Sequence, residues 1–323
     1  MSGRSKSSGQ NILKNSNKSS GKSSSPSTSK GGSEAYGVTI ITPTIRPQYM
    51  KRVLSNYARQ QWENKELIIV LNGNRMNMQR YLQAAEQYSG IHVIRLPASS
   101  TLGDCLNDAT AIACYPYIAK FDDDDYYGPG YLAEAMDTFE KTGADVVGKT
   151  SFFFYFPHRR QLLLRERPVQ PYEETNRIAG ATIMFRRNVL ETVSFGKRKQ
   201  GSDVQFIQDC LRSGLSVRTS SAYNFAAFRR ADRQSHTWKV TERKLFTDPR
   251  TKVFRTDDYW KIVDRQPEQL LQTSSRIKGP LLLKQHRQPI AASNPYCLRR
   301  SGTTPARRGI MKRTLRMNDC RHR

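Results

Sequence analysis

Four consecutive aspartates in the middle of the chain limit what it can fold into more than any other stretch. They occupy residues 122–125 and follow a short, mostly apolar run, residues 117–121, that is expected to form a buried strand. Gly128, Pro129 and Gly130 then end the extended structure, and apolar residues at helical spacing continue to Phe139. Adjacent carboxylates raise one another's pKa values, so a positive group is expected among them.

A divalent cation is one source of that positive charge. Hard oxygen ligands suit Mg²⁺ or Mn²⁺, which take one or two carboxylates and leave other positions for water and substrate phosphates. A solvated acidic turn is the alternative, and these residues alone leave it open. A calcium loop of the EF-hand type is excluded, because Tyr127 stands where glycine is required and Ala133 where the closing glutamate belongs.

The segment before the aspartates alternates between strands and helices. Apolar runs at 38–41, 67–71 and 92–95 are expected to be strands, and helical patterns separate them. This alternation predicts an α/β fold with a Rossmann-like, mostly parallel central sheet flanked by helices. Ligands bind at the carboxyl ends of such strands, and the polar residues placed there are Thr42, Thr44, Arg46, Asn72 and the aspartates. The first loop lacks the G-x-G-x-x-G pattern of dinucleotide-binding proteins.

Together these segments resemble the family 2 glycosyltransferases of the GT-A fold. The resemblance covers about residues 37–240 and is carried by the segments 40–47, 66–74 and 121–125, with Gly103, Asn107 and Pro129 in the family's order. It implies transfer of a sugar from a nucleotide-diphosphate sugar, with a UDP-sugar as the expected donor. It also implies that Thr42, Thr44 and Arg46 line the nucleotide pocket.

The family's D-x-D motif corresponds to Asp122, Asp123 and Asp124. By this resemblance Asp122 lies near the nucleotide ribose, Asp123 belongs to the same donor-binding motif, and Asp124 binds the Mn²⁺ or Mg²⁺ that bridges the diphosphate. Such a cation neutralises the leaving diphosphate as a Lewis acid. Asn72 stands where the family has an acidic residue that contacts the nucleobase or ribose, which leaves the identity of the base open.

The second half of the chain is expected to supply a smaller, acceptor-side subregion that begins with an aromatic hairpin over 151–165. Asp203 precedes a helix where the family commonly has an acidic pair, and it is the expected general base of an inverting displacement. A carboxylate in the first turn of a helix is the alternative. The basic and aromatic run 229–238 is expected to form a lid, and its His236 to complete the metal site; a plain surface histidine is the alternative.

Charge sets the two ends of the chain apart. The formal net charge is +25 over 323 residues, and residues 276–323 alone hold thirteen Lys or Arg against one Asp. The expected organisation is a disordered tail at 1–35, the GT-A domain at 36–240, a helical extension at 241–275 and a flexible basic tail at 276–323. The basic tails are expected to contact a polyanion.

Two functions of different class stay open. One is a metal-dependent glycosyltransferase that acts on an unknown saccharide, lipid-linked or protein acceptor. The other is a nonenzymatic basic scaffold that binds nucleic acid or an anionic surface through its tails. No stretch suits a signal peptide or transmembrane helix, and five cysteines without C-x-x-C spacing favour free thiols. The protein is therefore expected in the cytoplasm, with peripheral contact at an anionic surface.

Overall fold

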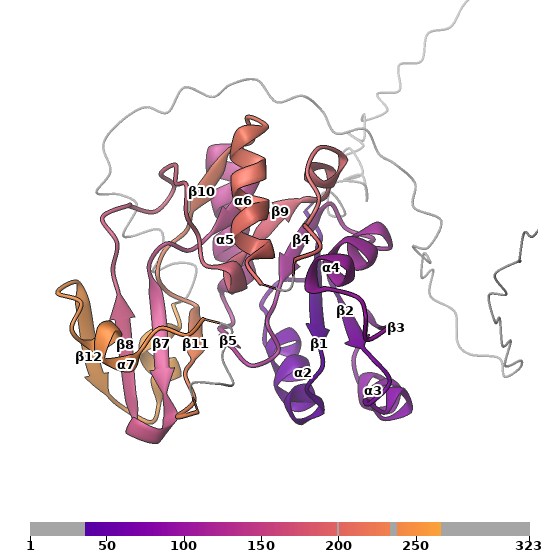
Figure 1. Cartoon of the computed structure of the whole chain (residues 1–323), viewed down its shortest axis with the longest axis horizontal. Coiled ribbons are helices and arrows are strands. Elements are labelled where there is room, and N and C mark those ends of the chain that lie inside the picture. The colour runs from indigo at the N-terminus through magenta and orange to yellow at the C-terminus, as the bar shows by residue number, and fades with distance from the viewer. Residues whose placement is uncertain (1–35, 199, 233–237, 266–323) are drawn as a thin grey trace, which may run out of the picture.

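Two β-sheets organise the part of the chain that the computed structural model describes, residues 36–198, 200–232 and 238–265 (Figure 1). The larger sheet has the strand order β10-β6-β9-β4-β1-β2-β3. Its strands are β1 (Val38–Thr44), β2 (Lys65–Asn72), β3 (Ile91–Leu96), β4 (Tyr117–Lys120), β6 (Val146–Gly148), β9 (Met184–Arg186) and β10 (Val217–Thr219).

The larger sheet is mostly parallel. β1 pairs in parallel with β2 and β4, β2 with β3, and β10 with β6, whereas β9 is antiparallel to both β4 and β6. Strand β2 is buried on both faces, because Leu67 and Ile69 join one core layer while Ile68 and Val70 join the other. A strand that is covered on both faces has consecutive apolar residues in its sequence. The predicted α/β class with a mostly parallel central sheet is confirmed.

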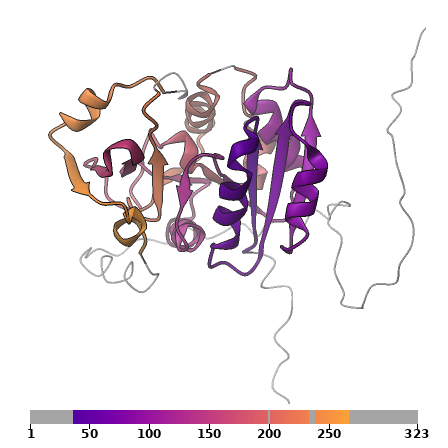
Figure 2. The same cartoon turned by 90° about the horizontal axis from the view of Figure 1, so that it is seen from below.

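Helices cover both faces of the larger sheet, as the view in Figure 2 shows. One core layer receives side chains of α2 (Met50–Ala58), α3 (Met78–Ala85) and α5 (Tyr131–Thr142). The opposite layer receives side chains of α4 (Leu102–Ala111) and α6 (Ser202–Arg212). Short 3₁₀ turns η1 (Pro47–Tyr49) and η4 (Arg187–Glu191) follow β1 and β9. The two layers bury the sheet and leave the carboxyl ends of its parallel strands free to form a site.

The smaller sheet contains the predicted aromatic hairpin and has the order β12-β8-β7-β11-β5. Its strands are β5 (Tyr126–Tyr127), β7 (Phe152–Phe156), β8 (Gln161–Arg165), β11 (Phe225–Phe228) and β12 (Thr251–Arg255), with η2 (Pro157–Arg159) in the hairpin turn. Helices α8 (Tyr259–Val263) and α7 (Glu242–Phe246) pack on its two faces. Because β5 directly follows the four aspartates, this sheet fixes the position of the acidic loop.

Two segments differ from what the sequence predicts. Residues 180–187, whose sequence pattern predicts one strand, are divided into a 3₁₀ turn, η3 (Gly180–Thr182), and the short strand β9. The segment 241–275, expected to be helical, contains α7 and α8 but also β12, which pairs with β8. A strand whose partner lies far away in the chain leaves little local signal.

Several expectations concern residues outside the described part. The tails 1–35 and 276–323 and the proposed metal ligand His236 all lie there, and the domain boundaries stay predictions. Within the ranges that the structure describes, no helix combines the length and the apolar character that a membrane crossing requires.

Candidate active site

The site lies where β1, β4 and the smaller sheet meet, beside a cavity of about 990 Å³. Asp122, Asp124 and Asp125 line this cavity together with Arg46 and Asp203. Strand β4 ends at Lys120, so the aspartates form the connection from β4 to β5. The predicted convergence of the acidic loop with the end of β1 is therefore observed.

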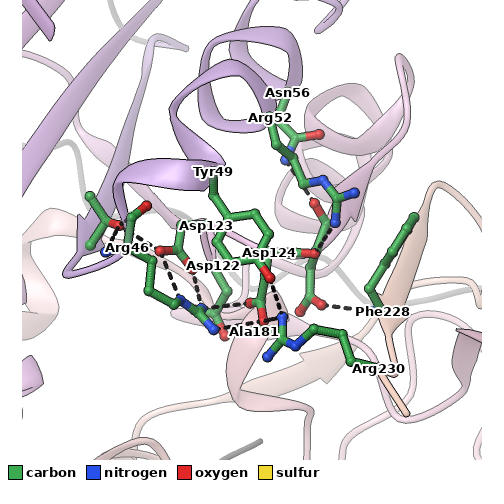
Figure 3. Close-up of polar contacts among 12 residues, drawn as sticks. Arg46, Tyr49, Arg52, Asn56, Asp122, Asp123, Asp124, Ala181, Phe228 and Arg230 are labelled. Carbon is green, nitrogen blue, oxygen red and sulfur yellow. Dashed lines mark hydrogen bonds and ion pairs between the residues drawn. The ribbon is translucent and has the colours of Figure 1, made fainter. Parts of the chain in front are cut away.

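Asp123 holds the first loop against the acidic loop (Figure 3). Its Oδ2 accepts hydrogen bonds from Thr44 Oγ1 at 2.5 Å and Arg46 Nε at 3.2 Å, and its Oδ1 accepts from Arg46 Nη2. Asp123 is buried, with 3% of its surface exposed, and is not among the cavity-lining residues. It therefore positions Arg46 at the cavity wall.

Two arginines hold the carboxylate of Asp124. Arg46 Nη1 and Arg230 Nη1 donate to Asp124 Oδ2 at 2.9 and 2.7 Å, and the ring of Tyr49 contacts both guanidinium groups (Figure 3). Burial alone would raise the pKa of Asp124, but Arg46 and Arg230 together hold it below its usual value. Asp124 is thus an anion at neutral pH.

A buried lysine joins Asp122 to Asp203. Lys120 Nζ lies 2.5 Å from Asp122 Oδ1 and 3.6 Å from Asp203 Oδ2, and it donates to the carbonyl of Gly180 at 3.2 Å. Burial favours the neutral amine, but Asp122 and Asp203 favour the ammonium and raise the pKa of Lys120 above its ordinary value. The lysine is therefore charged and links the donor-side aspartate to the expected base.

Asp125 plays a different part from the other three aspartates. Its Oδ1 accepts the backbone N–H of Phe228 at 2.9 Å, which ties the acidic loop to β11. Burial, followed by the charges of Asp124 and Asp122, raises the pKa of Asp125 well above its usual value. The fourth aspartate therefore has a structural contact and the weakest tendency to ionise.

The positive charge predicted among the aspartates is supplied by Lys120, Arg46 and Arg230. Side chains therefore supply the positive group that was expected among the aspartates, and a metal ion is not needed for this charge balance. Within residues 36–265 as far as the structure describes them, no three His, Cys, Asp or Glu side chains are grouped so as to hold a metal. Mg²⁺ and Mn²⁺ need only one or two carboxylates when phosphates complete the coordination, and Asp122 and Asp124 both line the cavity. The donor set fits a cation shared with a diphosphate.

Residues 39–194 match the sequence profile of Glycosyl transferase family 2. The chain contains a family 2 glycosyltransferase domain. The match agrees with the resemblance that the aspartate motif carries. No curated protein sequence matches the chain.

Solved structures of two transferases are similar to this chain. S. aureus TarS 1–349 in complex with UDP-GlcNAc is 19% identical over 60% of this chain and 59% of TarS 1–349, with a TM-score of 0.48. Mannosyltransferase PcManGT from Pyrobaculum calidifontis, in complex with GDP-Man and Mn²⁺, is 17% identical over 59% of this chain and 56% of its own, with a TM-score of 0.46. The chain thus spans less than two thirds of either protein, and these similarities are too low to transfer a substrate or a mechanism.

Two predicted donor-site residues, Thr42 and Asn72, do not line the cavity. Thr42 is buried in β1. Asn72 ends β2, where its Nδ2 donates to the carbonyl of Ser100 at 2.8 Å. Its Oδ1 is buried without a hydrogen-bond partner. A buried acceptor without a partner is costly, so Asn72 offers a hydrogen-bond acceptor at the end of β2.

Asp203 lies in the first turn of α6. This position is compatible with both predicted roles, the general base and a carboxylate that stabilises the start of a helix. Its Oδ1 is buried without a partner, and its Oδ2 faces Lys120. A Cβ atom on Gly180 would meet Asp203 Oδ2 at 2.3 Å, so only glycine at 180 leaves room for this carboxylate. The fold therefore holds Asp203 at the cavity with one oxygen uncommitted.

Sequence reasoning missed Lys120 and Tyr49 as parts of the site, and assigned Arg230 only to a lid. Lys120 carried a usable signal, because a single lysine inside a buried apolar strand needs a counterion. Arg230 lies 106 residues from Asp124 in the chain, and only the fold reveals their contact.

Proposed function

We propose that this protein transfers a sugar from a UDP-sugar to an acceptor hydroxyl with inversion at the anomeric carbon. The observation that carries the proposal is the placement of Asp122, Asp124 and Asp203 around one cavity, with the buried Lys120 between Asp122 and Asp203. This arrangement separates a diphosphate-binding side from a proton-accepting side. Transfer requires both functions in one site.

On the donor side, Arg46 and Arg230 have donor groups that suit phosphate oxygens. Arg46 lines the cavity and Arg230 lies behind Asp124; their hydrogen bonds to Asp124 balance the charge of the two guanidinium groups. Mg²⁺ or Mn²⁺ held by Asp122 and Asp124 would supply Lewis-acid neutralisation of the diphosphate. Mn²⁺ in the PcManGT complex supports this choice of ion. Asp123 contributes by holding Arg46 in place.

On the acceptor side, Asp203 takes the proton of the attacking hydroxyl. The acceptor oxygen then forms a bond to the anomeric carbon as the bond between that carbon and the diphosphate oxygen breaks, and the nucleoside diphosphate leaves with the electron pair. The uncommitted Oδ1 of Asp203 is the atom available for the proton. The Nζ of Lys120 lies 3.6 Å from Asp203 Oδ2 and holds the carboxylate beside the acceptor side of the cavity.

The choice of a UDP-sugar rests on the family resemblance. The buried Oδ1 of Asn72 is compatible with it, because the N3–H of uracil can donate to such an acceptor. UDP-GlcNAc in the TarS complex is a donor of this class. A cytoplasmic location suits the three cysteines that the described residues contain, all of them free thiols.

Thermal melting with a panel of nucleotide sugars tests the proposal. A ligand that binds the folded state raises the melting temperature. UDP-sugars are expected to do so in the presence of Mn²⁺, and CDP-sugars are not. If no nucleotide sugar changes the melting temperature with or without Mn²⁺, the donor assignment is wrong.

A further inference from the structure

The cavity continues beyond the catalytic residues onto the smaller sheet. Its far wall is formed by Phe152 and Phe154 of β7, Arg165 of β8, and the exposed ring of Trp238. The connection 166–179 closes one side of this wall. An acceptor that reaches Asp203 from this direction has to lie against these side chains.

The charges of this far wall all have one sign. Arg165, Arg167, Arg177 and Arg250 belong to it, and Arg229 lies beside Trp238, 5.9 Å from its ring. The carboxylates that line the cavity, residues 122, 124, 125 and 203, belong to the catalytic end. We name Arg165, Arg167, Arg177 and Arg250 the arginine wall. Like charges gathered at one cavity repel one another unless an anion joins them.

Protein carboxylates compensate the arginine wall only in part. Asp248 lies 3.8 Å from Arg165 and 3.5 Å from Arg250, measured from Nε to carboxylate oxygen. Among the described residues no carboxylate lies within ion-pair distance of Arg167 or Arg177, although Arg167 is close enough to Asp248 to contribute to lowering its pKa. The Nε of Arg165 is buried without a hydrogen-bond partner. These guanidinium groups therefore have donors available for a ligand.

The backbone holds Arg167 and Arg177 at the cavity. The N–H of Arg167 donates to Ser151 Oγ at 2.8 Å, and the N–H of Arg177 donates to Thr175 Oγ1 at 3.2 Å. Thr175 is itself fixed by a backbone hydrogen bond to Val217 of β10 at 3.0 Å. Arg167 and Arg177 thus stand on an anchored connection, which lowers the entropic cost of ligand binding.

Trp238 adds a flat apolar surface beside the arginines. It is 47% exposed and stacks on Phe154 with ring centroids 6.0 Å apart. The guanidinium of Arg165 lies 5.6 Å from its ring. A sugar ring can pack on such an aromatic face while an attached anionic group meets the arginines.

We infer that the acceptor is an anionic saccharide, one that carries phosphate or carboxylate groups, and that the arginine wall binds it. This inference rests on the proposed transfer reaction and names its acceptor class. Guanidinium groups form bidentate hydrogen bonds with both phosphate and carboxylate groups. The arginine wall therefore indicates a negatively charged acceptor, and the experiment below distinguishes phosphate from carboxylate.

Binding of three labelled oligomers to the full chain, followed by fluorescence anisotropy, tests the inference. The oligomers are a glycerol-phosphate oligomer, an oligogalacturonate and a neutral maltooligosaccharide of equal length. We expect at least one anionic oligomer to bind and the neutral one not to bind. The preferred anion identifies the group as phosphate or carboxylate, and equal binding of the neutral oligomer would overturn the inference.

The double variant Arg167→Gln/Arg177→Gln is expected to weaken this binding about tenfold or more, because two charge-assisted contacts are lost. The matched control is Arg80→Gln/Arg255→Gln, which removes the same charge from exposed arginines that do not line the cavity. Both double variants keep the basic tails and lose the same net charge. If the oligomer binds through the tails, the two variants should therefore be affected equally. Equal weakening would refute the arginine wall.

The melting experiment with UDP-sugars separates this inference from the proposed function. A protein that is stabilised by a UDP-sugar and Mn²⁺ but binds neither anionic oligomer keeps its donor assignment and loses the acceptor assignment. A protein that no nucleotide sugar stabilises loses both, because the acceptor class presupposes the transfer reaction.

Discussion

Replacing Lys120 with methionine tests the electrostatic connection between the two sides of the site. Methionine keeps an unbranched apolar chain and removes the ammonium that contacts Asp122 at 2.5 Å, Asp203 at 3.6 Å and the carbonyl of Gly180 at 3.2 Å. Removing one partner of a buried ion pair costs about 3–5 kcal/mol of unfolding free energy. The exposed fractions of the Asp122 and Asp203 side chains, 36% and 24%, admit water and reduce the loss. We therefore expect a loss of about 2–3 kcal/mol, or about 5–10 °C in melting temperature.

The loss of unfolding free energy in Lys120→Met is expected to depend on pH. In the unmodified protein the pKa of Lys120 is raised, so its contribution to stability is present throughout the range below the ordinary lysine pKa of about 10.4. In Lys120→Met the carboxylates lack their cation, and the pKa of Asp122, which burial already raises above its usual value, rises further because Lys120 no longer lowers it. The penalty is then full at neutral pH and fades as the pH falls toward about 4, where the carboxylates bind protons.

Denaturant unfolding at several pH values measures this effect, with Lys141→Met as the control. Lys141 forms an exposed ion pair with Asp137 at 2.9 Å, and its loss is expected to cost about 0–1 kcal/mol. In a background of Asp203→Asn the loss from Lys120→Met should shrink, since one of the unpaired charges is gone. A loss no larger than that of the control, or one that does not change with pH, would show that Lys120 does not balance these aspartates.

Three further substitutions probe the proposed roles. Asp124→Asn is expected to abolish Mn²⁺-dependent binding of a UDP-sugar while the protein stays folded, and calorimetry with and without Mn²⁺ checks this; unchanged binding would remove Asp124 from the metal site. Asp203→Asn should leave donor binding intact and slow transfer by about 10²–10⁴-fold, as measured by release of UDP, and full turnover would exclude it as the base. Gly180→Ala places a methyl group where Asp203 Oδ2 now lies, at 2.3 Å, so we expect slower transfer with nearly normal donor binding. An equal loss of donor binding would instead indicate a wider disturbance.

The regular part of the fold could be predicted from the sequence because its signals are local. Strand β2 is a continuous apolar run since both of its faces are buried, and the loops that follow β1 and β4 meet at one edge because parallel strands end there. Thr44, Arg46 and Asp123 converge for that reason. The short strand β12 was not predictable, because it depends on pairing with β8 across a long stretch of chain.

The charge balance of the site was the least predictable feature. Four adjacent aspartates indicate that cations are needed, but they do not indicate which ones. Lys120 lies next to them in sequence, whereas Arg46 and Arg230 come from loops 78 and 106 residues away. In the structure, Lys120, Arg46 and Arg230 balance the charge of the acidic loop, and only the fold shows which cations do so.

A crystal structure with a UDP-sugar and Mn²⁺ tests the central claim most directly, through the anomalous scattering of manganese. The account predicts a manganese peak in contact with Asp124 and with the diphosphate, and guanidinium groups of Arg46 and Arg230 that have turned from Asp124 toward phosphate oxygens. A nucleotide bound elsewhere, with Asp124 still held by both arginines and no manganese beside it, would contradict the account.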